Sequence, residues 1–314
     1  MNNSTLLPNY TGFARIKLFL ALSRTPHGLI DMSTPAFCAM LWLAAFPPLN
    51  VVLLGMITAF AGYTAVYALN DVIDYRVDRE NLPKSGIHSA ENDLDAVMIR
   101  HPMAQGYLTF KAGLVWSAAW AAIALVGAYM LNPICVLFFL IGCVLETVYC
   151  LMLKISYLRV IVSGVVKTLG GMAAVFAVDP NPSYGFLMIL FFCLFFWEIG
   201  GQNIPNDWTD LKEDKALKAR TIPVRYGAGR ARIIVLGCLF MAVGFSLYLF
   251  SISRLGSDIP IMMIVLMIGF YLLILPGWRL YQTKARREAM RLFNKASYYP
   301  LALLGLVVFW VIIF

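Results

Sequence analysis

Two short segments of the sequence carry the same pattern of side chains that could bind metal. Residues 70–78 read NDVIDYRVD and residues 206–214 read NDWTDLKED, so both follow N-D-x-x-D-x-x-x-D. Spacings of three and seven residues place the carboxylates of each copy on one face of a helix. Carboxylates about 6 Å apart repel each other by roughly 2–3 kcal/mol per pair at an effective dielectric constant near 20. Such clusters favour divalent cations, so the duplication predicts metal sites rather than two solvated helix ends.

Oxygen ligands suit magnesium, which proteins usually share between a few carboxylates and the phosphate oxygens of a substrate. A basic segment follows each copy, RHPMAQG at 100–106 and KALKARTIPVRYG at 215–227. Arginine holds phosphate through planar, bidentate contacts, which makes Arg100 and Arg220 the favoured contacts for a diphosphate. For neighbours such as Lys218, retention of cations on the cytoplasmic side of the membrane explains the charge equally well. The predicted metal ligands are Asp71, Asp74, Asp78, Asp207, Asp210 and Asp214.

The elements that must position these residues are membrane helices. Of the 314 residues, 61% are hydrophobic and only 13% are charged, and the mean hydropathy is +0.76. A spanning helix needs about 20 mostly apolar residues. We therefore expect an all-α integral membrane protein with one domain over 1–314, in which the two acidic motifs mark an internal pseudo-repeat. The nine expected spans are 20–46, 49–70, 110–131, 133–153, 157–178, 184–205, 231–252, 258–278 and 298–314.

The basic residues predict the orientation, because Lys and Arg are retained on the cytoplasmic side of short loops. With nine spans, all of the 25 Lys and Arg residues except Lys167 and Arg254 lie on one side. We expect this side to be the cytoplasmic face of the cytoplasmic membrane. It would hold the N-terminus and the acidic loops after spans 2 and 6, with the C-terminus opposite. The net charge of +8 then needs no nucleic-acid partner.

Four charged residues lie inside the expected spans, namely Asp31, Glu146, Lys167 and Glu198. Each costs about 2.5–3.5 kcal/mol at the centre of a membrane helix, so these side chains should face the interior of the bundle. Lys167 has two explanations, a structural ion pair with Glu198 or a role at the reacting centre. The scattered histidines and cysteines receive no metal-binding role.

The sequence resembles the UbiA superfamily of intramembrane prenyltransferases. The resemblance is carried by both acidic motifs, by R-x-P-x-x-x-G at 100–106 and by R-T-x-P-V-x-x-G at 220–227. It implies two Mg²⁺ ions, replaceable by Mn²⁺, which hold an allylic prenyl diphosphate for transfer to an aromatic or lipid acceptor. The implied catalytic residues are Asp71, Asp74, Asp207 and Asp210, and the candidate diphosphate contacts are Asn70, Arg100, Tyr149, Lys154, Asn206, Lys218 and Arg220. Lys167 joins the candidate catalytic residues because of its position inside a span and not through the resemblance.

The sequence also departs from the family pattern. An acidic insertion occupies 84–97, and the spacing between Tyr149 and Lys154 is one residue longer than in the family's Y-x-x-x-K. No acceptor-specific signature is present, so the acceptor, the prenyl length and the oligomeric state stay open. A terpene cyclase of the same superfamily is the alternative function, and a magnesium channel or carrier is a third.

Overall fold

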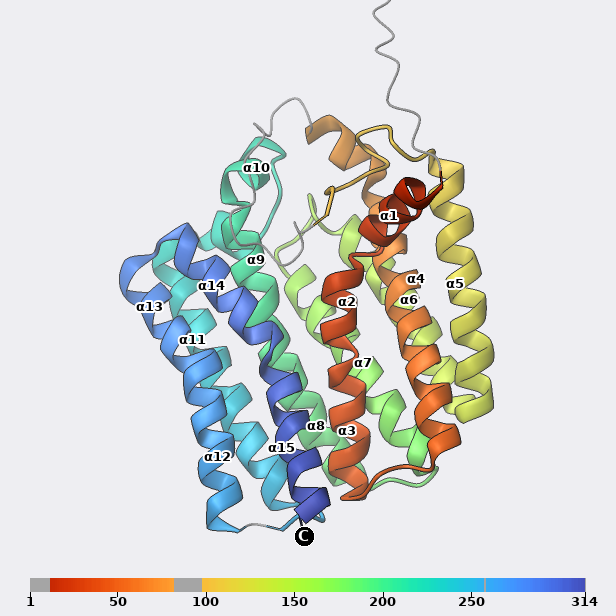
Figure 1. The fold of residues 1–314 in the computed structure, drawn as a ribbon. Coiled ribbons are helices and arrows are strands. Elements are labelled where there is room, and N and C mark those ends of the chain that lie inside the picture. The colour runs from red at the N-terminus through yellow and green to blue at the C-terminus, as the bar shows by residue number, and fades with distance from the viewer. Residues whose placement is uncertain (1–11, 82–97, 257, 314) are drawn as a thin grey trace, which may run out of the picture.

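The computed structural model describes residues 12–81, 98–256 and 258–313. Every regular element within these ranges is a helix, which confirms the predicted all-α class. The acidic insertion at 84–97 lies outside the described residues. The helices run side by side as a bundle (Figure 1).

Eight helical segments within the described ranges are long and apolar enough to cross a bilayer, as expected for an integral membrane protein. Four are single helices that follow each other along the chain: α4 (Leu49–Asn81), α5 (Phe110–Leu131), α6 (Pro133–Leu151) and α7 (Arg159–Val178). The next is a composite of α8 (Tyr184–Trp197), the π-helix η2 (Glu198–Asn203) and α9 (Ile204–Thr209). After the short α10 (Leu211–Ala216) come α11 (Ile222–Ser251), then α12 (Ile259–Gly269) with η3 (Phe270–Ile274) and α13 (Leu275–Thr283), and finally α14 (Arg286–Ser297) with α15 (Tyr299–Ile313).

The first expected span, 20–46, is not one of these eight segments. The chain there forms α1 (Phe13–Leu22), α2 (Thr25–Asp31) and α3 (Ser33–Leu43). Arg24 separates α1 from α2 because its backbone is left-handed, with φ 44°, and Pro26 then occupies the first turn of α2, where its missing N–H is tolerated. The expected count of nine spans is therefore not reproduced by helix length, although α2 and α3 run alongside the other helices (Figure 1).

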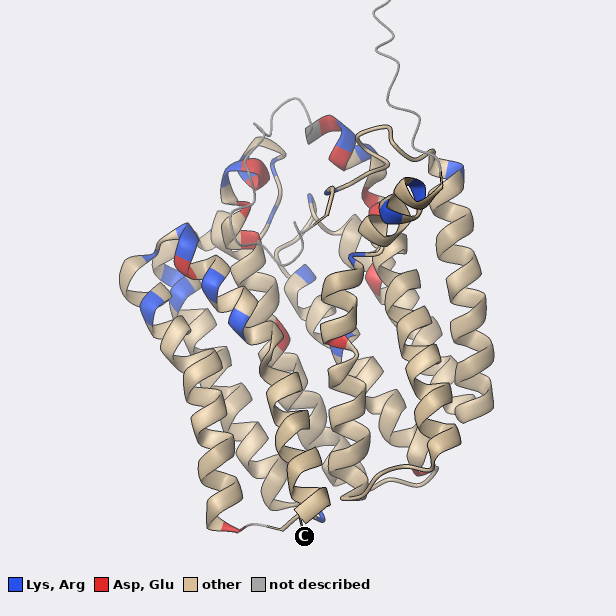
Figure 2. Ribbon diagram, viewed as in Figure 1, with Lys and Arg blue, Asp and Glu red and all other residues tan. Residues whose placement is uncertain are grey.

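Charged residues gather at one end of the bundle (Figure 2). The Lys, Arg, Asp and Glu positions lie mainly around α1, α9, α10, α13 and α14, and few lie near the C-terminus at the other end. This segregation matches the distribution that the sequence predicts. Both acidic motifs belong to the charged end.

The apolar core holds α7 and α8 close together, and glycine permits the approach. A Cβ at Gly164 would lie 2.6 Å from Cδ2 of Phe195, and one at Gly171 would lie 2.7 Å from Cδ1 of Leu194. These distances are too short for an unperturbed side-chain contact, so each glycine lets the facing helix pack against the backbone of α7. Close packing fixes the side-chain positions of α7, including Lys167, relative to α8.

Candidate active site

The first acidic motif lies on one uninterrupted helix, as its spacing predicts. Asp71, Asp74 and Asp78 all belong to α4, which continues to Asn81. Asp71 is buried, with an exposed fraction of 4%. Nη2 of Arg24 lies 3.4 Å from its Oδ1, so the helix break before α2 places a guanidinium against the motif.

His101 lies between two carboxylates of this motif. Its Nδ1 is 2.9 Å from Oδ2 of Asp78 and 3.6 Å from Oδ1 of Asp71. Burial on its own lowers the pKa of His101, but the contacts with these carboxylates and their negative charges raise it to about 10. The sequence indicated no metal-binding role for the histidines; the structure adds that His101 contacts two carboxylates of the first motif. Its place within 100–106, directly after Arg100, was the signal available in the sequence.

One ligand atom from each of Asp71, Asp78 and His101 lies within 4.8 Å of the others, a spacing that suits a shared cation. Carboxylate oxygens fit Mg²⁺ well, whereas a protonated imidazole donates hydrogen bonds and does not ligate a metal. The donor set therefore fits a magnesium ion held by the carboxylates of α4. His101 balances the charge of these carboxylates when its ring is protonated.

The second motif does not lie on one helix, which differs from the expectation. Asp207 belongs to α9, whereas Asp210 separates α9 from α10 with φ −97° and ψ 13°. Asp214 is buried in α10 and accepts a hydrogen bond from Oγ1 of Thr221 at 3.0 Å. Burial and the negative charge of Asp207 raise the pKa of Asp214 to about 8. The bend turns Asp214 toward the start of α11.

Arginines face the second motif as well. Nη1 of Arg159 lies 3.9 Å from Oδ1 of Asp207, and its guanidinium lies over the ring of Tyr149, 4.0 Å from the centroid. Nη2 of Arg100 lies 3.7 Å from Oδ2 of Asp210, so Arg100 follows the first motif in sequence but contacts the second in space. The other carboxylate oxygen of Asp207 is buried without a hydrogen-bond partner among the described residues. An unpartnered carboxylate oxygen of this kind is available to a metal ion.

Both motifs open into one cavity of about 1710 Å³. Its polar end lies among the motifs, and its apolar walls come from α3, α4, α6 and α7. Sequence-predicted residues that line it are Asn70, Asp74, Asp78, Arg100, Tyr149, Lys167, Asn206, Asp207, Asp210 and Asp214. A charged head group and an apolar chain can therefore occupy a single space.

Tyr149 and Asn70 are held by hydrogen bonds at the cavity wall. The Tyr149 hydroxyl accepts a hydrogen bond from Nδ2 of Asn203 at 2.9 Å. Nδ2 of Asn70 donates to Oε1 of Glu146 at 2.7 Å, so this intramembrane carboxylate has a polar partner, as expected for a charge inside a bundle. These contacts fix both cavity-lining side chains in place.

Three predicted cationic contacts are not brought to this cavity. Lys154 is exposed and lies 3.4 Å from Oε2 of Glu80. Lys218 is exposed, and Arg220 is exposed with its Nη1 donating to the carbonyl oxygen of Ile155 at 3.1 Å. In their place the structure brings Arg24 and Arg159 to the carboxylates, residues that the sequence analysis counted only toward orientation.

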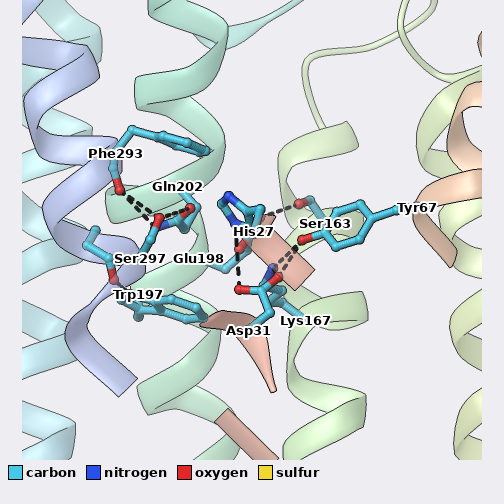
Figure 3. Close-up of polar contacts among 11 residues, drawn as sticks. His27, Asp31, Tyr67, Ser163, Lys167, Trp197, Glu198, Gln202, Phe293 and Ser297 are labelled. Atoms are coloured by element: carbon cyan, nitrogen blue, oxygen red, sulfur yellow. Dashed lines mark hydrogen bonds and ion pairs between the residues drawn. The ribbon is translucent and has the colours of Figure 1, made fainter. Parts of the chain in front are cut away.

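A separate polar cluster lies deeper in the cavity (Figure 3). Nζ of Lys167 on α7 is 2.5 Å from Oδ2 of Asp31 on α2. The hydroxyl of Tyr67 on α4 donates to the same oxygen, and Nε2 of His27 lies 3.6 Å from Oδ1 of Asp31. Asp31 thus gathers polar groups from three helices around one buried carboxylate.

Of the two explanations of Lys167, the ion pair with Glu198 does not form, because the ammonium group of Lys167 pairs with Asp31. Oε1 of Glu198 instead accepts a hydrogen bond from Oγ of Ser163 at 2.8 Å. The expected spans place Asp31 about as deep in the membrane as Lys167, so depth alone did not favour Glu198 over Asp31. What the sequence did not show is which helix lies beside α7 at that depth, and the structure places α2 there.

Comparison with known proteins decides the family. The family model described as the UbiA prenyltransferase family matches residues 32–304, most of the chain. The chain belongs to the UbiA prenyltransferase family. It is 26% identical to the digeranylgeranylglyceryl phosphate synthase of Thermococcus sibiricus over 212 residues, which cover 68% of this chain and 69% of that protein. It is 24% identical to the synthase of the same name from Thermococcus kodakarensis, over 71% of this chain and 73% of that protein.

Solved structures of UbiA homologues share the fold. The apo structure of a homologue from Aeropyrum pernix K1 matches with a TM-score of 0.69 at 16% identity, over 90% of this chain and 97% of that one. A homologue from Archaeoglobus fulgidus, bound to GPP and Mg²⁺, matches with a TM-score of 0.66 at 16% identity, over 93% and 99%. At this identity the likeness establishes the UbiA fold, and the family match identifies this UbiA protein as a prenyltransferase.

Proposed function

We propose that the protein is a Mg²⁺-dependent enzyme that ionises an allylic prenyl diphosphate and transfers the prenyl group to an aromatic or lipid acceptor. The observation that carries this proposal is the single cavity, with both acidic motifs and their arginines at one end and apolar walls at the other. A prenyl diphosphate has the same division between a charged head and an apolar chain. The names of the curated relatives and the GPP and Mg²⁺ bound to the A. fulgidus homologue support it.

Within this proposal the carboxylates of the two motifs hold two Mg²⁺ ions, for which Mn²⁺ can substitute. The metal supplies Lewis-acid stabilisation of the diphosphate. Arg24, Arg100 and Arg159 hold diphosphate oxygens through bidentate contacts. When the bond from the allylic carbon to oxygen breaks, its electron pair leaves with the diphosphate, and these guanidinium groups stabilise the added charge.

The proposed location is the cytoplasmic membrane, with the charged end of the bundle on the cytoplasmic side. Its concentration of Lys and Arg (Figure 2) follows the rule that basic residues are retained there. The prenyl chain then lies along the apolar walls of the cavity at membrane depth. An acceptor that is itself a membrane lipid reaches the reacting carbon without leaving the bilayer.

The test uses the full chain in lipid nanodiscs with geranylgeranyl diphosphate as the probe. We expect diphosphate release that requires Mg²⁺ or Mn²⁺ and stops when EDTA is added. Asp71→Asn and Asp207→Asn should each lower release at least 100-fold, because each removes a metal-binding charge at almost constant volume. Asp258→Asn, at the opposite end of the bundle before α12, is the matched control and should keep wild-type release.

Near-normal release by both Asp71→Asn and Asp207→Asn would show that the two motifs do not share a diphosphate site. Product analysis without an added acceptor distinguishes the two reaction types. A cyclic hydrocarbon would favour the terpene-cyclase alternative. Metal flux through the membrane without diphosphate release would favour a carrier.

A further inference from the structure

Glu198 has a carboxylate oxygen that the fold leaves without a partner. The residue is buried, with an exposed fraction of 7%, and it lines the cavity that contains both acidic motifs. Its Oε1 accepts the hydrogen bond from Ser163. Its Oε2 is buried and has no hydrogen-bond partner among the described residues. Burial of a charged acceptor without a hydrogen-bond donor lowers the stability of the fold by about 1–3 kcal/mol or more, compared with an acceptor that has a donor.

Local structure holds this carboxylate at the cavity wall. Glu198 is the first residue of η2, and single π-helical turns within longer helices occur frequently at functional sites. On another side of η2, a Cβ at Gly200 would lie 2.6 Å from Cβ of Cys238 and 3.0 Å from the carbonyl oxygen of Val235. This contact fixes η2 against α11. Glu198 and Gln202 meanwhile line the cavity.

The neighbouring charges favour a neutral ligand at Glu198. Lys167 is the nearby cation in this cluster, and its ammonium group pairs with Asp31 at 2.5 Å. Among the described residues Glu198 forms no ion pair within 4 Å, and its hydrogen bond is the one from Ser163 (Figure 3). A second anion here would repel the carboxylate, whereas a hydroxyl can donate a hydrogen bond to Oε2.

The diphosphate head does not provide this donor. Glu198 precedes Asp207 by roughly 13 Å along the helix, at about 1.5 Å per residue, and the head group carries negative charge. The hydrogen-bond donor that reaches Glu198 therefore belongs to another molecule, bound in the part of the cavity far from the head group. In a prenyl-transfer site that second molecule is the acceptor.

We propose that Oε2 of Glu198 accepts a hydrogen bond from a hydroxyl of the prenyl acceptor. The part of the acceptor that contacts Glu198 is a neutral alcohol or phenol. The inference rests on the proposed transferase function. Ser163 orients the carboxylate through Oε1, and the Lys167–Asp31 pair keeps the surrounding net charge low. Glu198 is thus a specificity-determining residue that selects a hydroxyl over an anion or an ether.

Binding of small fluorinated probes tests the proposal without prenyl diphosphate. The probes are 4-fluorophenol, its methyl ether 4-fluoroanisole and the anion 4-fluorobenzoate, followed by ¹⁹F NMR with the full chain in nanodiscs. Spectra with empty nanodiscs correct for partition into lipid. We expect the phenol to bind about tenfold more tightly than either other probe, because only the phenol donates a hydrogen bond to a carboxylate.

Glu198→Gln should weaken phenol binding about three- to tenfold, because hydrogen bonds to a charged acceptor are stronger than those to a neutral amide. Asp179→Asn is the matched control. Its carboxylate accepts from Nε1 of Trp42 at the other end of α7, and phenol affinity should stay at the wild-type value. The wild-type comparison of the three probes needs no variant and covers the case in which Glu198→Gln fails to fold.

Equal binding of the phenol and the ether would overturn the proposal, as would tighter binding of the benzoate. Unchanged phenol affinity in folded Glu198→Gln would mean that Oε2 holds only water. Failure of the proposed function has a different signature, the absence of diphosphate release from geranylgeranyl diphosphate by the wild-type protein. The two failures are therefore distinguished by separate measurements.

Discussion

Nζ of Lys167 lies 2.5 Å from Oδ2 of Asp31, so a buried ion pair joins α7 to the short helix α2. Because α2 also carries His27 and follows directly after Arg24, this pair helps to set the position of the broken first span. Removing one partner leaves an uncompensated charge in the interior, which typically costs about 3–5 kcal/mol, whereas removing both costs much less.

Lys167→Met should therefore lower the melting temperature strongly, and adding Asp31→Asn should recover much of the loss. Combining Lys167→Met with Glu198→Gln serves as the control and should give no comparable recovery. Melting temperature and turnover measured on all variants separate this structural role from a role at the reacting centre. A Lys167→Met protein with wild-type stability and reduced turnover would favour the catalytic assignment.

Arg159 is expected to bind diphosphate, because it contacts Asp207 and lies at the cavity wall. Arg159→Lys keeps the charge but removes the planar fork, so the apparent KM for geranylgeranyl diphosphate should rise about tenfold. Arg279→Gln, on the charged end but outside the cavity lining, is the comparison variant. Equal kinetics in Arg159→Lys and the wild type would remove Arg159 from the site.

Asp214 should make the metal-free protein less stable at high pH. Its pKa is raised from 3.8 to about 8 by burial and the charge of Asp207, so the folded state binds the proton more tightly than the unfolded state. This contribution to stability is fully present below about pH 4 and is lost as the pH rises through about 8. In EDTA, the melting temperature should therefore fall less between pH 5 and pH 9 for Asp214→Asn than for the wild type. An equal fall in melting temperature for the two proteins would contradict the raised pKa of Asp214. The control Asp258→Asn should show the same fall in melting temperature as the wild type.

Gly200 is expected to be intolerant of a side chain. In Gly200→Ala the new Cβ would approach backbone and side-chain atoms of α11 at 3.0 Å and 2.6 Å, and overpacking of this kind usually costs about 1–3 kcal/mol. Gly237→Ala on α11 is the matched control, because a Cβ there meets no atom within 4 Å and alanine is the better helix former. Thermal unfolding should show a loss for the first variant and none for the second. A Gly200→Ala protein as stable as the wild type would mean that η2 can shift away from α11.

The sequence by itself determined the all-α membrane class, the segregation of charge and the family. These features depend on local properties, namely the length of apolar runs, the placement of Lys and Arg and the spacing within a motif. The i, i+3, i+7 pattern was sufficient for Asp71, Asp74 and Asp78 because α4 continues through all three. In the second motif the same spacing gave the wrong geometry, because the helix ends at Asp210.

Only the tertiary structure decided which charges meet. Lys167 pairs with Asp31, His101 lies between two carboxylates, and Arg100 contacts the second motif. Each contact joins helices or loops that are separated in the chain. The Lys167–Asp31 contact involves α2, the helix that follows the left-handed Arg24. Sequence periodicity reports which face of a helix is buried, but not which neighbouring helix covers that face. The partners follow from packing, because a buried charge is stable only where another helix supplies its counter-charge or hydrogen bond.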